Sequence, residues 1–412
     1  MRILMLLPQP FFEPRGTSFS SLHRLRTLAD MGHRVDLLTY PFGQDIAHPN
    51  VHIVRIPRLP FIKGARVGPS REKLLLDLVW MIPYSVRMVL RTHYDLIHSH
   101  EEACFWGAAL AQWRRIPHLY DMHSSLPQQL LNFKFTTSRL ALGFFRWAEK
   151  KTLRSAQGVI AICPELANHV TALAPHTPVA VIENVLELEP PRQVQPLAPE
   201  TLRRQYHLHG RKVVLYTGTF EPYQGIELLI RAARHVVAQI PKGSFVLVGG
   251  RPEQVAFYRQ LAEEQGVGPH CVFVGSVPPE RIRDFYAVAD VLVSPRFEGT
   301  NTPLKIYSYL RSGVPIVATD HVTHTQVLSD RVAILTPIDA PSLAQGILRV
   351  LVDPSLARRL ASAAQQLAAE RYSPAVYHAK LRALLTQVTN TTPRRSESVA
   401  KIVAPAPPIA SE

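Results

Sequence analysis

Short apolar runs alternate along the chain with longer segments in which apolar residues recur every three or four positions. The short runs are typical of buried strands, and the longer period is typical of amphipathic helices. In the first half, the pattern predicts strands within residues 2–7, 34–40, 51–56, 95–100, 117–124, 158–162 and 178–184. It predicts helices near 18–31, 71–91, 101–115 and 138–155, and after Pro164.

The second half repeats this alternation. The predicted strands lie within 212–218, 244–250, 271–276, 290–295, 314–320 and 332–337, and the predicted helices lie near 224–239, 252–266, 279–289, 303–312, 340–352, 354–370 and 374–388. Strand–helix alternation on this scale predicts an α/β fold, in which helices cover both faces of parallel sheets.

A proline-rich interval at 186–200 divides the chain, and we interpret it as a linker. It separates an N-terminal domain, 1–185, from a C-terminal domain, 201–373, which is followed by a helix at 374–388. The polar, proline-rich tail 389–412 is predicted to be disordered. Two doubly wound domains of this kind face each other across a cleft, and ligands bind there at the carboxyl ends of the strands.

Lys305 is the most unusual residue in the loops that follow strands. It lies in the first turn of the predicted helix 303–312. The amino end of a helix is already positive, so a cation there is unfavourable unless an anion binds from outside. The alternative is a solvated lysine, which is the usual state of this residue type.

Other loops after strands carry weaker candidates. Gly16 precedes good N-cap residues and leaves backbone N–H groups open to a phosphate, although a lone glycine is usually only a turn. His123 ends a strand at the expected cleft, although a lone histidine is more often structural. Asp121 either orients His123 or only caps the strand end. Gly218 ends another strand, and Arg251 follows a glycine pair.

Positive charge is in excess, with 46 Lys and Arg against 32 acidic residues and a formal net charge of +14. Residues 51–92 alone hold eight Lys or Arg and two acids. An anionic membrane surface or a phosphorylated substrate fits this excess. Nucleic acid fits less well, because we find no helix-turn-helix signal, zinc-ligand spacing or RNP-type strand.

The chain is expected to be cytoplasmic. Its three cysteines are not closely paired, which indicates thiols in a reducing compartment. The apolar start breaks at Pro8, too early for a secretory signal. The most apolar stretch, 74–90, is too short and too polar to span a bilayer. One expected exception is peripheral contact with the inner face of the membrane through the basic segment 51–92. The alternative for this segment is a solvated helix face together with core residues.

The motifs taken in chain order resemble the retaining glycosyltransferase family 4, which has the GT-B fold of two Rossmann-like domains. The resemblance covers roughly residues 1–385. The matching stretches are "GTSFSSLHRLRTLADMGHRVDLLT", "DLIHSH", "DMHSSLP", "VIAICPELANHV", "VIENV", "VLYTGTFEPYQGIELLIRAA", "FVLVGG", "VFVGSVPPERIRDFYAVADVLVSP" and "PLKIYSYLRSGVPIVATD".

The resemblance implies transfer of a hexose from a nucleotide diphosphate-sugar with retention of anomeric configuration. This donor is a substrate, and no cofactor is implied. The C-terminal domain would hold the nucleotide, the N-terminal domain would hold a glycan or lipid-linked acceptor, and the last helix would cross back to the first domain. His123 would contact and orient the donor sugar.

The chain departs from the family at the donor site. Where the family has two glutamates, this sequence has Thr300 and Ser308, so Glu298 is the candidate substitute and Ser308 keeps a weaker hydrogen bond to the ribose. Where the family has two cations for the diphosphate, this sequence has Thr219 or Phe220, and Gln224.

We therefore expect the diphosphate site to be rebuilt from one loop. Lys305 and Arg296 would supply charge, and charge-assisted hydrogen bonds to phosphate are worth about 1.5–3 kcal/mol each. The expected donor-binding residues are Gly16, Gly218, Thr219, Arg296, Thr300, Asn301, Thr302, Lys305 and Ser308, with Arg251 as a weaker candidate.

The predicted transfer needs no metal, because basic side chains and helix amino ends stabilise the departing nucleotide diphosphate. His98 and His100 have metal-like spacing on a strand, but the resemblance favours a structural or acceptor-side role. Two other functions stay open. The missing glutamates and cations favour a non-catalytic protein that binds nucleotide-sugar or glycan. The second of these other functions is that of a GT-B epimerase, although the extra carboxylates of such an enzyme are not found in this sequence.

Overall fold

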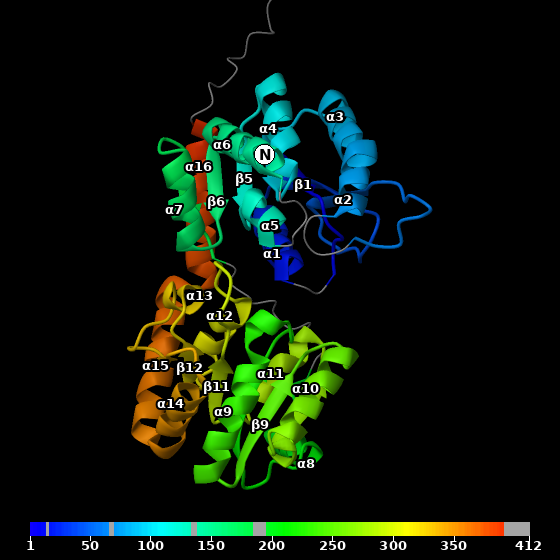
Figure 1. Ribbon diagram of the computed structural model, residues 1–412. Coiled ribbons are helices and arrows are strands. Elements are labelled where there is room, and N and C mark those ends of the chain that lie inside the picture. Colours follow the sequence, from blue (N-terminus) through cyan, green and yellow to red (C-terminus); the bar gives the residue numbers. More distant parts are fainter. Residues whose placement is uncertain (14–15, 66–69, 133–137, 184–194, 391–412) are drawn as a thin grey trace, which may run out of the picture.

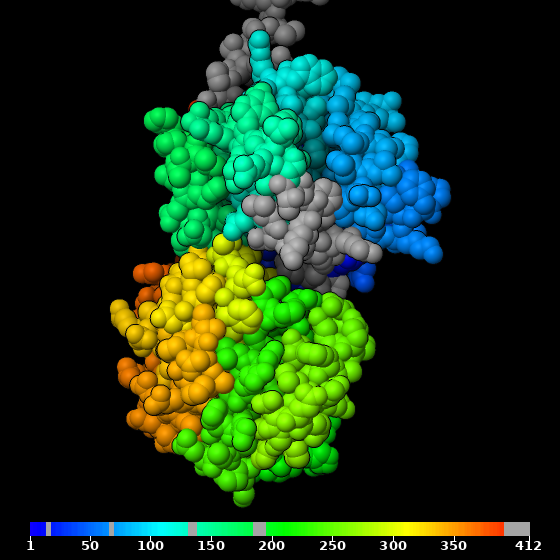
Figure 2. All heavy atoms as spheres, in the orientation of Figure 1, coloured from blue at the N-terminus to red at the C-terminus, as the bar shows by residue number. Residues whose placement is uncertain are grey.

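The structure is a computed structural model that describes residues 1–13, 16–65, 70–132, 138–183 and 195–390. It contains two parallel β-sheets, one in each half of the chain. The expected linker therefore lies mostly outside the described residues, as does all but the start of the expected tail. Figure 1 shows the two halves one above the other, and the outline of the molecule narrows between them (Figure 2).

The first sheet has seven strands in the order β3-β2-β1-β4-β5-β6-β7. Its strands are β1 Arg2–Leu7, β2 Arg34–Thr39, β3 Val51–Arg55, β4 Leu96–His100, β5 His118–Met122, β6 Gly158–Ala161 and β7 Val179–Val181. Its helices are α1 Gly16–Asp30, α2 Arg71–Leu76, the π-helix η1 Asp77–Met81, α3 Ile82–Arg91, α4 Ala103–Arg114, α5 Leu126–Asn132, α6 Arg139–Ser155 and α7 Pro164–Leu173.

The second sheet has six strands in the order β10-β9-β8-β11-β12-β13. Its strands are β8 Lys212–Thr217, β9 Gly243–Val248, β10 Cys271–Gly275, β11 Val291–Ser294, β12 Ile316–Thr319 and β13 Ile334–Thr336. The helices in this half of the chain are α8 Pro199–Gln205, α9 Ile226–Gln239, α10 Pro252–Glu264, α11 Ile282–Tyr286, α12 Leu304–Arg311, α13 Val322–Thr325, α14 Ala340–Val352 and α15 Pro354–Arg371, followed by the last helix, α16 Pro374–Asn390. Short 3₁₀ turns are η2 Pro222–Gln224, η3 Gly268–His270 and η4 Pro279–Arg281.

This architecture confirms the predicted fold class of two Rossmann-like, doubly wound α/β domains. The strand order reverses beside β1 in the first sheet and beside β8 in the second. Such a reversal opens a crevice at the carboxyl ends of the strands. The β-strands are almost fully buried in the centre of each sheet, as their continuous apolar sequences require.

The last helix, α16, packs against β6 and β7 of the first sheet (Figure 1). Gly158 makes this possible, because a Cβ there would stand 2.5 Å from the Val388 side chain. Lys380 adds an ion pair with Glu183 at 2.7 Å. The two halves also meet where Gln326, at the end of α13, accepts from the Glu165 backbone N–H of α7 at 3.0 Å. Gln326 also donates to the Thr300 carbonyl of its own half at 2.7 Å.

The predicted helix 71–91 is interrupted by the π-helix η1. Pro83 lacks an N–H and its ring crowds the carbonyl four residues earlier, so a wider turn just before it relieves the clash. Two basic side chains of segment 51–92, which we expected on its surface, instead bind groups of the protein itself. Lys73 is buried against Glu102, and the Arg55 guanidinium bonds backbone carbonyls, including Phe42 O at 2.7 Å.

Candidate functional site

The carboxyl ends of β8 and β11 bring Lys305 and Gln224 together. Lys305, the second residue of α12, donates from Nζ to Gln224 Oε1 at 3.2 Å. Its ammonium lies 3.8 Å from the centre of the Tyr216 ring, which is a cation–π contact. Lys305 therefore has fixed partners at the end of β8 and is not a freely solvated lysine.

The surroundings of Lys305 disfavour its positive charge. Burial, and next the nearby Arg296, keep the pKa of Lys305 well below its usual value. Burial also lowers the pKa of Arg296. In the part of the chain that the structure describes, neither cation forms an ion pair with a carboxylate. Two close cations without such a partner create a local field that attracts an anion.

Two glycines allow the loops after β8, β9 and β11 to pack this tightly. Gly225 has φ of 77°, and a Cβ there would stand 2.1 Å from the Pro295 carbonyl oxygen. Gly249 has φ of 125°, and its Cβ would stand 1.8 Å from the Gly218 carbonyl oxygen. Only glycine fits either position. The Lys305 ammonium lies 3.5 Å from where a Cβ on Gly218 would be.

Arg296 organises the loop between β11 and α12. Its guanidinium is buried over the Tyr223 ring, donates from Nε to the Glu298 carbonyl at 2.7 Å, and donates from Nη2 to Asn301 Oδ1 at 3.2 Å. The side-chain oxygen of Asn301 is thus engaged inside the protein. The Glu298 side chain is exposed, and its catalytic role stays a prediction.

The amino end of α12 lies within one residue of the predicted helix start. The helix begins at Leu304, and Pro303 precedes it as the N-cap residue. The first-turn N–H groups therefore belong to Leu304 and Lys305. Thr302 is buried, and Thr300 offers its carbonyl to Gln326.

The remaining donor-side candidates lie on different elements. Ser308 faces the Tyr286 hydroxyl, and Thr219 is exposed after β8. Gly16 is the first residue of α1 in the other half. Arg251 is ill suited to a diphosphate, because it already pairs with Glu221 at 2.7 Å.

His123 belongs to a buried network at the carboxyl ends of β4 and β5. Its Nε2 lies 3.2 Å from His100 Nδ1 and 3.5 Å from Asp121 Oδ1, and the two imidazole rings stack. Arg24 of α1 donates from Nε to Asp121 Oδ2 at 2.8 Å, and both side chains are about 1% exposed. Burial alone would raise the pKa of Asp121, but Arg24 and the histidines hold it well below its usual value.

Within the described residues, the side chains of His98, His100 and Asp121 form one group with metal-ligand character, its ligand atoms within 4.8 Å of one another. The carboxylate oxygen nearest His98 is the Oδ2 that accepts from Arg24. A dication there would lie beside the guanidinium and compete with it for that oxygen. We therefore interpret the group as an ion-paired network, and the absence of a metal stays a prediction.

Family models match both halves of the chain. Residues 15–189 match the model described as Glycosyltransferase Family 4, and residues 199–367 match the one described as Glycosyl transferases group 1. The chain belongs to the family 4 glycosyltransferases. This confirms the predicted family, and the chain is therefore a glycosyltransferase.

Named relatives span most of this glycosyltransferase. The phosphatidyl-myo-inositol mannosyltransferase of Mycolicibacterium smegmatis is 26% identical over 366 residues, which cover 86% of each chain. The alpha-D-kanosaminyltransferase of Streptomyces kanamyceticus is 25% identical over 366 residues, covering 83% of this chain and 91% of the relative.

Solved structures share its fold. Sucrose-phosphate synthase from Thermosynechococcus elongatus superposes with a TM-score of 0.73 at 23% identity, covering 94% of this chain and 99% of that one. Anabaena HepE, solved in complex with UDP, also gives a TM-score of 0.73, at 18% identity, covering 94% of this chain and all of that one.

Glu149 of α6 is a residue of this glycosyltransferase that no sequence motif indicated. Its buried carboxylate accepts from Ser125 Oγ at 3.0 Å, from the Leu126 backbone N–H at 3.1 Å and from His169 Nε2 at 2.7 Å. The hydrogen bond to Glu149 raises the pKa of His169. Glu149 thus fixes the segment that follows His123. Its partners lie 20–24 residues away on other elements, so no local motif reveals it.

Glu149→Gln is expected to lower the free energy of unfolding of the N-terminal half by about 2–3 kcal/mol, because an amide NH₂ would face N–H donors. Urea unfolding followed by tryptophan fluorescence measures this, since all four tryptophans lie in that half. Asp30→Asn is the matched control, because its exposed pair with His48 is worth at most about 1 kcal/mol. An equal loss of unfolding free energy in both variants would contradict the role of Glu149 in fixing the segment after His123.

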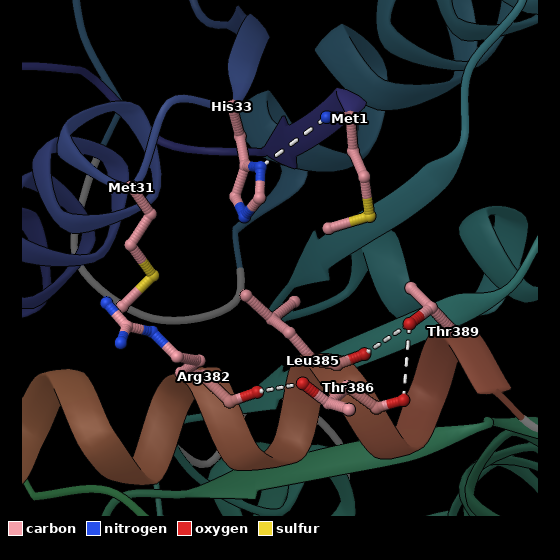
Figure 3. Close-up of a pocket in the computed structure, with 7 residues that line it drawn as sticks. All are labelled: Met1, Met31, His33, Arg382, Leu385, Thr386 and Thr389. Carbon is pink, nitrogen blue, oxygen red and sulfur yellow. Dashed lines mark hydrogen bonds between the residues drawn. The ribbon is translucent and has the colours of Figure 1, made fainter.

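One pocket of about 320 Å³ lies at the amino ends of the strands of the first sheet, away from the carboxyl ends where His123 lies (Figure 3). It is bounded by Met1 and His33, which precede β1 and β2, and by Leu385 on the facing side of α16. The Met1 amino group lies 3.5 Å from His33 Nδ1. The candidate site lies at the carboxyl ends of the strands, so this pocket at their amino ends is separate from it.

Proposed function

We propose that this glycosyltransferase moves a hexose from a nucleotide diphosphate-sugar to a glycan or lipid-linked acceptor with retention of configuration. The observation that carries the proposal is the contact between Lys305 and Gln224. Gln224 occupies a place where the family resemblance implies a lysine, and the Lys305 ammonium stands 3.2 Å from its side-chain oxygen. A cation is thus supplied to the expected diphosphate position from a different element.

In the proposed mechanism, Lys305 and the amino end of α12 hold the diphosphate, and Arg296 adds positive charge behind the loop. The bond between the sugar C1 and the diphosphate oxygen breaks, and a bond from C1 to the acceptor oxygen forms on the same face. The acceptor proton passes to the departing phosphate oxygen. Cationic groups fixed near that oxygen stabilise the negative charge that develops on it, which is the role a metal plays in other transferases.

The N-terminal half would hold the sugar and the acceptor. His123 is buried between His100 and Asp121, so its ring orientation is set before a ligand binds. A preset imidazole suits the role of orienting a sugar hydroxyl. The name of the Mycolicibacterium relative, a phosphatidyl-myo-inositol mannosyltransferase, favours a lipid-linked acceptor for this chain as well.

The alternative is a non-catalytic protein that binds nucleotide-sugar or glycan, which the exposed side chain of Glu298 favours. The test is a panel of UDP, GDP and ADP in thermal shift, followed by a donor-sugar panel read by release of nucleoside diphosphate. We expect a rise of several degrees with one nucleotide, and release from the matching donor that falls in His123→Ala. A nucleotide shift without release from any donor supports the alternative. No shift with any nucleotide contradicts the transferase and favours a non-catalytic protein that binds glycan.

A further inference from the structure

The last helix brings one buried side chain into the network around His123. Helix α16 follows α15 of the C-terminal half and runs along the first sheet (Figure 1). The centre of its Tyr377 ring lies 5.1 Å from the guanidinium carbon of Arg24, which is a cation–π contact. The two residues are 5% and 1% exposed, so water screens this contact only weakly. Tyr377 therefore fixes one face of the Arg24 guanidinium group.

The Tyr377 hydroxyl and the Arg24 guanidinium group also affect each other's ionisation. Burial raises the pKa of Tyr377 to about 12, and Arg24 opposes this rise through its charge and a hydrogen bond. Burial alone would lower the pKa of Arg24, but Asp121 and then Tyr377 raise it above its usual value. Arg24 is thus held from two sides, by the Asp121 carboxylate and by the Tyr377 side chain.

Asp121 connects Arg24 to His123. Its Oδ2 accepts from Arg24 Nε at 2.8 Å, and its Oδ1 lies 3.5 Å from His123 Nε2. Within the described residues, Oδ1 is a buried oxygen that accepts no hydrogen bond. A negative oxygen at this place favours the ring proton of His123 on Nε2, which leaves Nδ1 as the accepting nitrogen.

We infer that Tyr377 is a positioning residue for the transfer reaction. It holds Arg24, Arg24 holds the Asp121 carboxylate, and this carboxylate sets the orientation and the tautomer of His123. The inference rests on the proposed function, in which His123 orients the donor sugar. An imidazole that accepts through Nδ1 suits a hydroxyl group that donates, so the ligand of this ring is a sugar hydroxyl.

The segment that carries Tyr377 also packs on the donor side. Shortly before it in the chain, Tyr372 contacts Tyr307 of α12, with the ring centres 5.1 Å apart. The Tyr372 carbonyl accepts a hydrogen bond from Arg311, at the end of the same helix. Helix α12 carries Lys305 as well. The ring that orients the sugar is therefore held by a segment that borders the diphosphate helix.

The first test is Tyr377→Phe, which keeps the ring over Arg24 and removes the hydroxyl. We expect release of nucleoside diphosphate from the matching donor to fall about 10- to 100-fold, because a misplacement of about 1 Å can have an effect of this size. The affinity for nucleoside diphosphate, measured by calorimetric titration, should not change, because Lys305 is unaltered. Tyr372→Phe is the matched control. It removes another buried tyrosine hydroxyl from the same segment, and its turnover should equal that of the parent.

The second test observes the His123 ring directly and needs no turnover. Nitrogen NMR of the full chain, with its histidines isotope-labelled on the ring nitrogens, distinguishes the two neutral tautomers at pH 8. The signals that are missing in His123→Ala belong to His123. We expect the form with the proton on Nε2 in the parent and a mixture of the two forms in Tyr377→Phe.

The third test asks whether Tyr377 acts through Arg24. Arg24→Lys keeps a positive charge but loses the planar guanidinium group, so turnover should fall. Adding Tyr377→Phe to Arg24→Lys should then lower turnover no further, because the contact on which Tyr377 depends is already gone.

Turnover equal to that of the parent, or unchanged His123 signals, in Tyr377→Phe overturns the inference. An equal fall in Tyr372→Phe also overturns it, because the effect would then belong to the whole segment. Losses that multiply in the double variant do the same. If the parent releases nucleoside diphosphate from no donor, the proposed transfer fails, and the NMR measurement alone then decides whether Tyr377 positions His123.

Discussion

Replacing Lys305 by methionine is expected to weaken nucleoside diphosphate binding by about 10- to 150-fold, which corresponds to the loss of one charge-assisted hydrogen bond of about 1.5–3 kcal/mol. Donor turnover should fall further, by roughly 10²–10³, because charge on the departing diphosphate grows in the transition state. Calorimetric titration with the nucleotide that stabilises the parent measures the first effect, and release of nucleoside diphosphate measures the second.

The same substitution is expected to stabilise the free protein. The pKa of Lys305 is lowered in the folded state, because burial and Arg296 disfavour its charge. The unfolded chain therefore holds this proton more tightly, and the burial of the ammonium group opposes folding. Methionine has a similar length and no charge, so a gain of about 0.5–2 kcal/mol is expected from the melting temperature without nucleotide.

Lys242→Met is the matched control, since Lys242 is exposed at the far edge of the same domain. It should change neither nucleotide affinity nor stability appreciably. Full nucleotide affinity in Lys305→Met would remove Lys305 from the donor site. A loss of both affinity and stability would mean instead that Lys305 supports the fold, and that the altered affinity is indirect.

The sequence was informative about Lys305 because the relevant signal is local. A cation in the first turn of a helix conflicts with the helix dipole, and that conflict needs no partner to be recognised. The partner is a different matter. Gln224 lies 81 residues away, and the two meet only because β8 and β11 are neighbours in the second sheet. The periodicity of the sequence does not give the order of the strands in the sheet. Only the structure therefore showed that Lys305 reaches the place of the cation that Gln224 replaces.

The network around Asp121 was likewise predictable in its local part and not in its distant part. The sequence predicted His123 and Asp121 together, because two positions on a strand end share a face. It did not predict Arg24, which is 97 residues from Asp121 and reaches it from α1 across the sheet. Likewise, the apolar periodicity of α6 predicted a helix, but not that Leu140, Phe144 and Trp147 would face outward. A helix with apolar residues on two sides does not reveal which side the core uses.

Mild acid, near pH 5, is expected to destabilise the N-terminal half, because this half holds several buried or partly buried histidines whose pKa values are lowered. Burial lowers the pKa of His118 to about 3, and burial with nearby arginines lowers that of His23 to about 4. Burial also lowers the pKa values of His98 and His100. All four have an ordinary value of 6.5, so the unfolded chain binds their protons first as the pH falls.

The stability linked to these groups is complete above about pH 6.5 and is lost progressively toward their folded pKa values. Between pH 6.5 and 5, each histidine that stays neutral in the fold costs about 2 kcal/mol, at about 1.4 kcal/mol per pH unit. His118 and His23 alone then remove about 4 kcal/mol, a large part of the 5–15 kcal/mol that typically holds a domain together. Urea unfolding at pH 8, 6.5 and 5, followed by tryptophan fluorescence, measures this loss.

His118→Gln separates protonation from packing. It removes the hydrogen bond between His118 and Ser99 at 2.6 Å, so some stability is lost at every pH. It also removes one titrating group, so the difference in stability between pH 8 and pH 5 should shrink by about 2 kcal/mol. His93→Gln is the matched control, because that side chain is 76% exposed and its removal should leave the difference unchanged. A parent protein equally stable at both pH values would mean that the buried histidines accept protons within the fold.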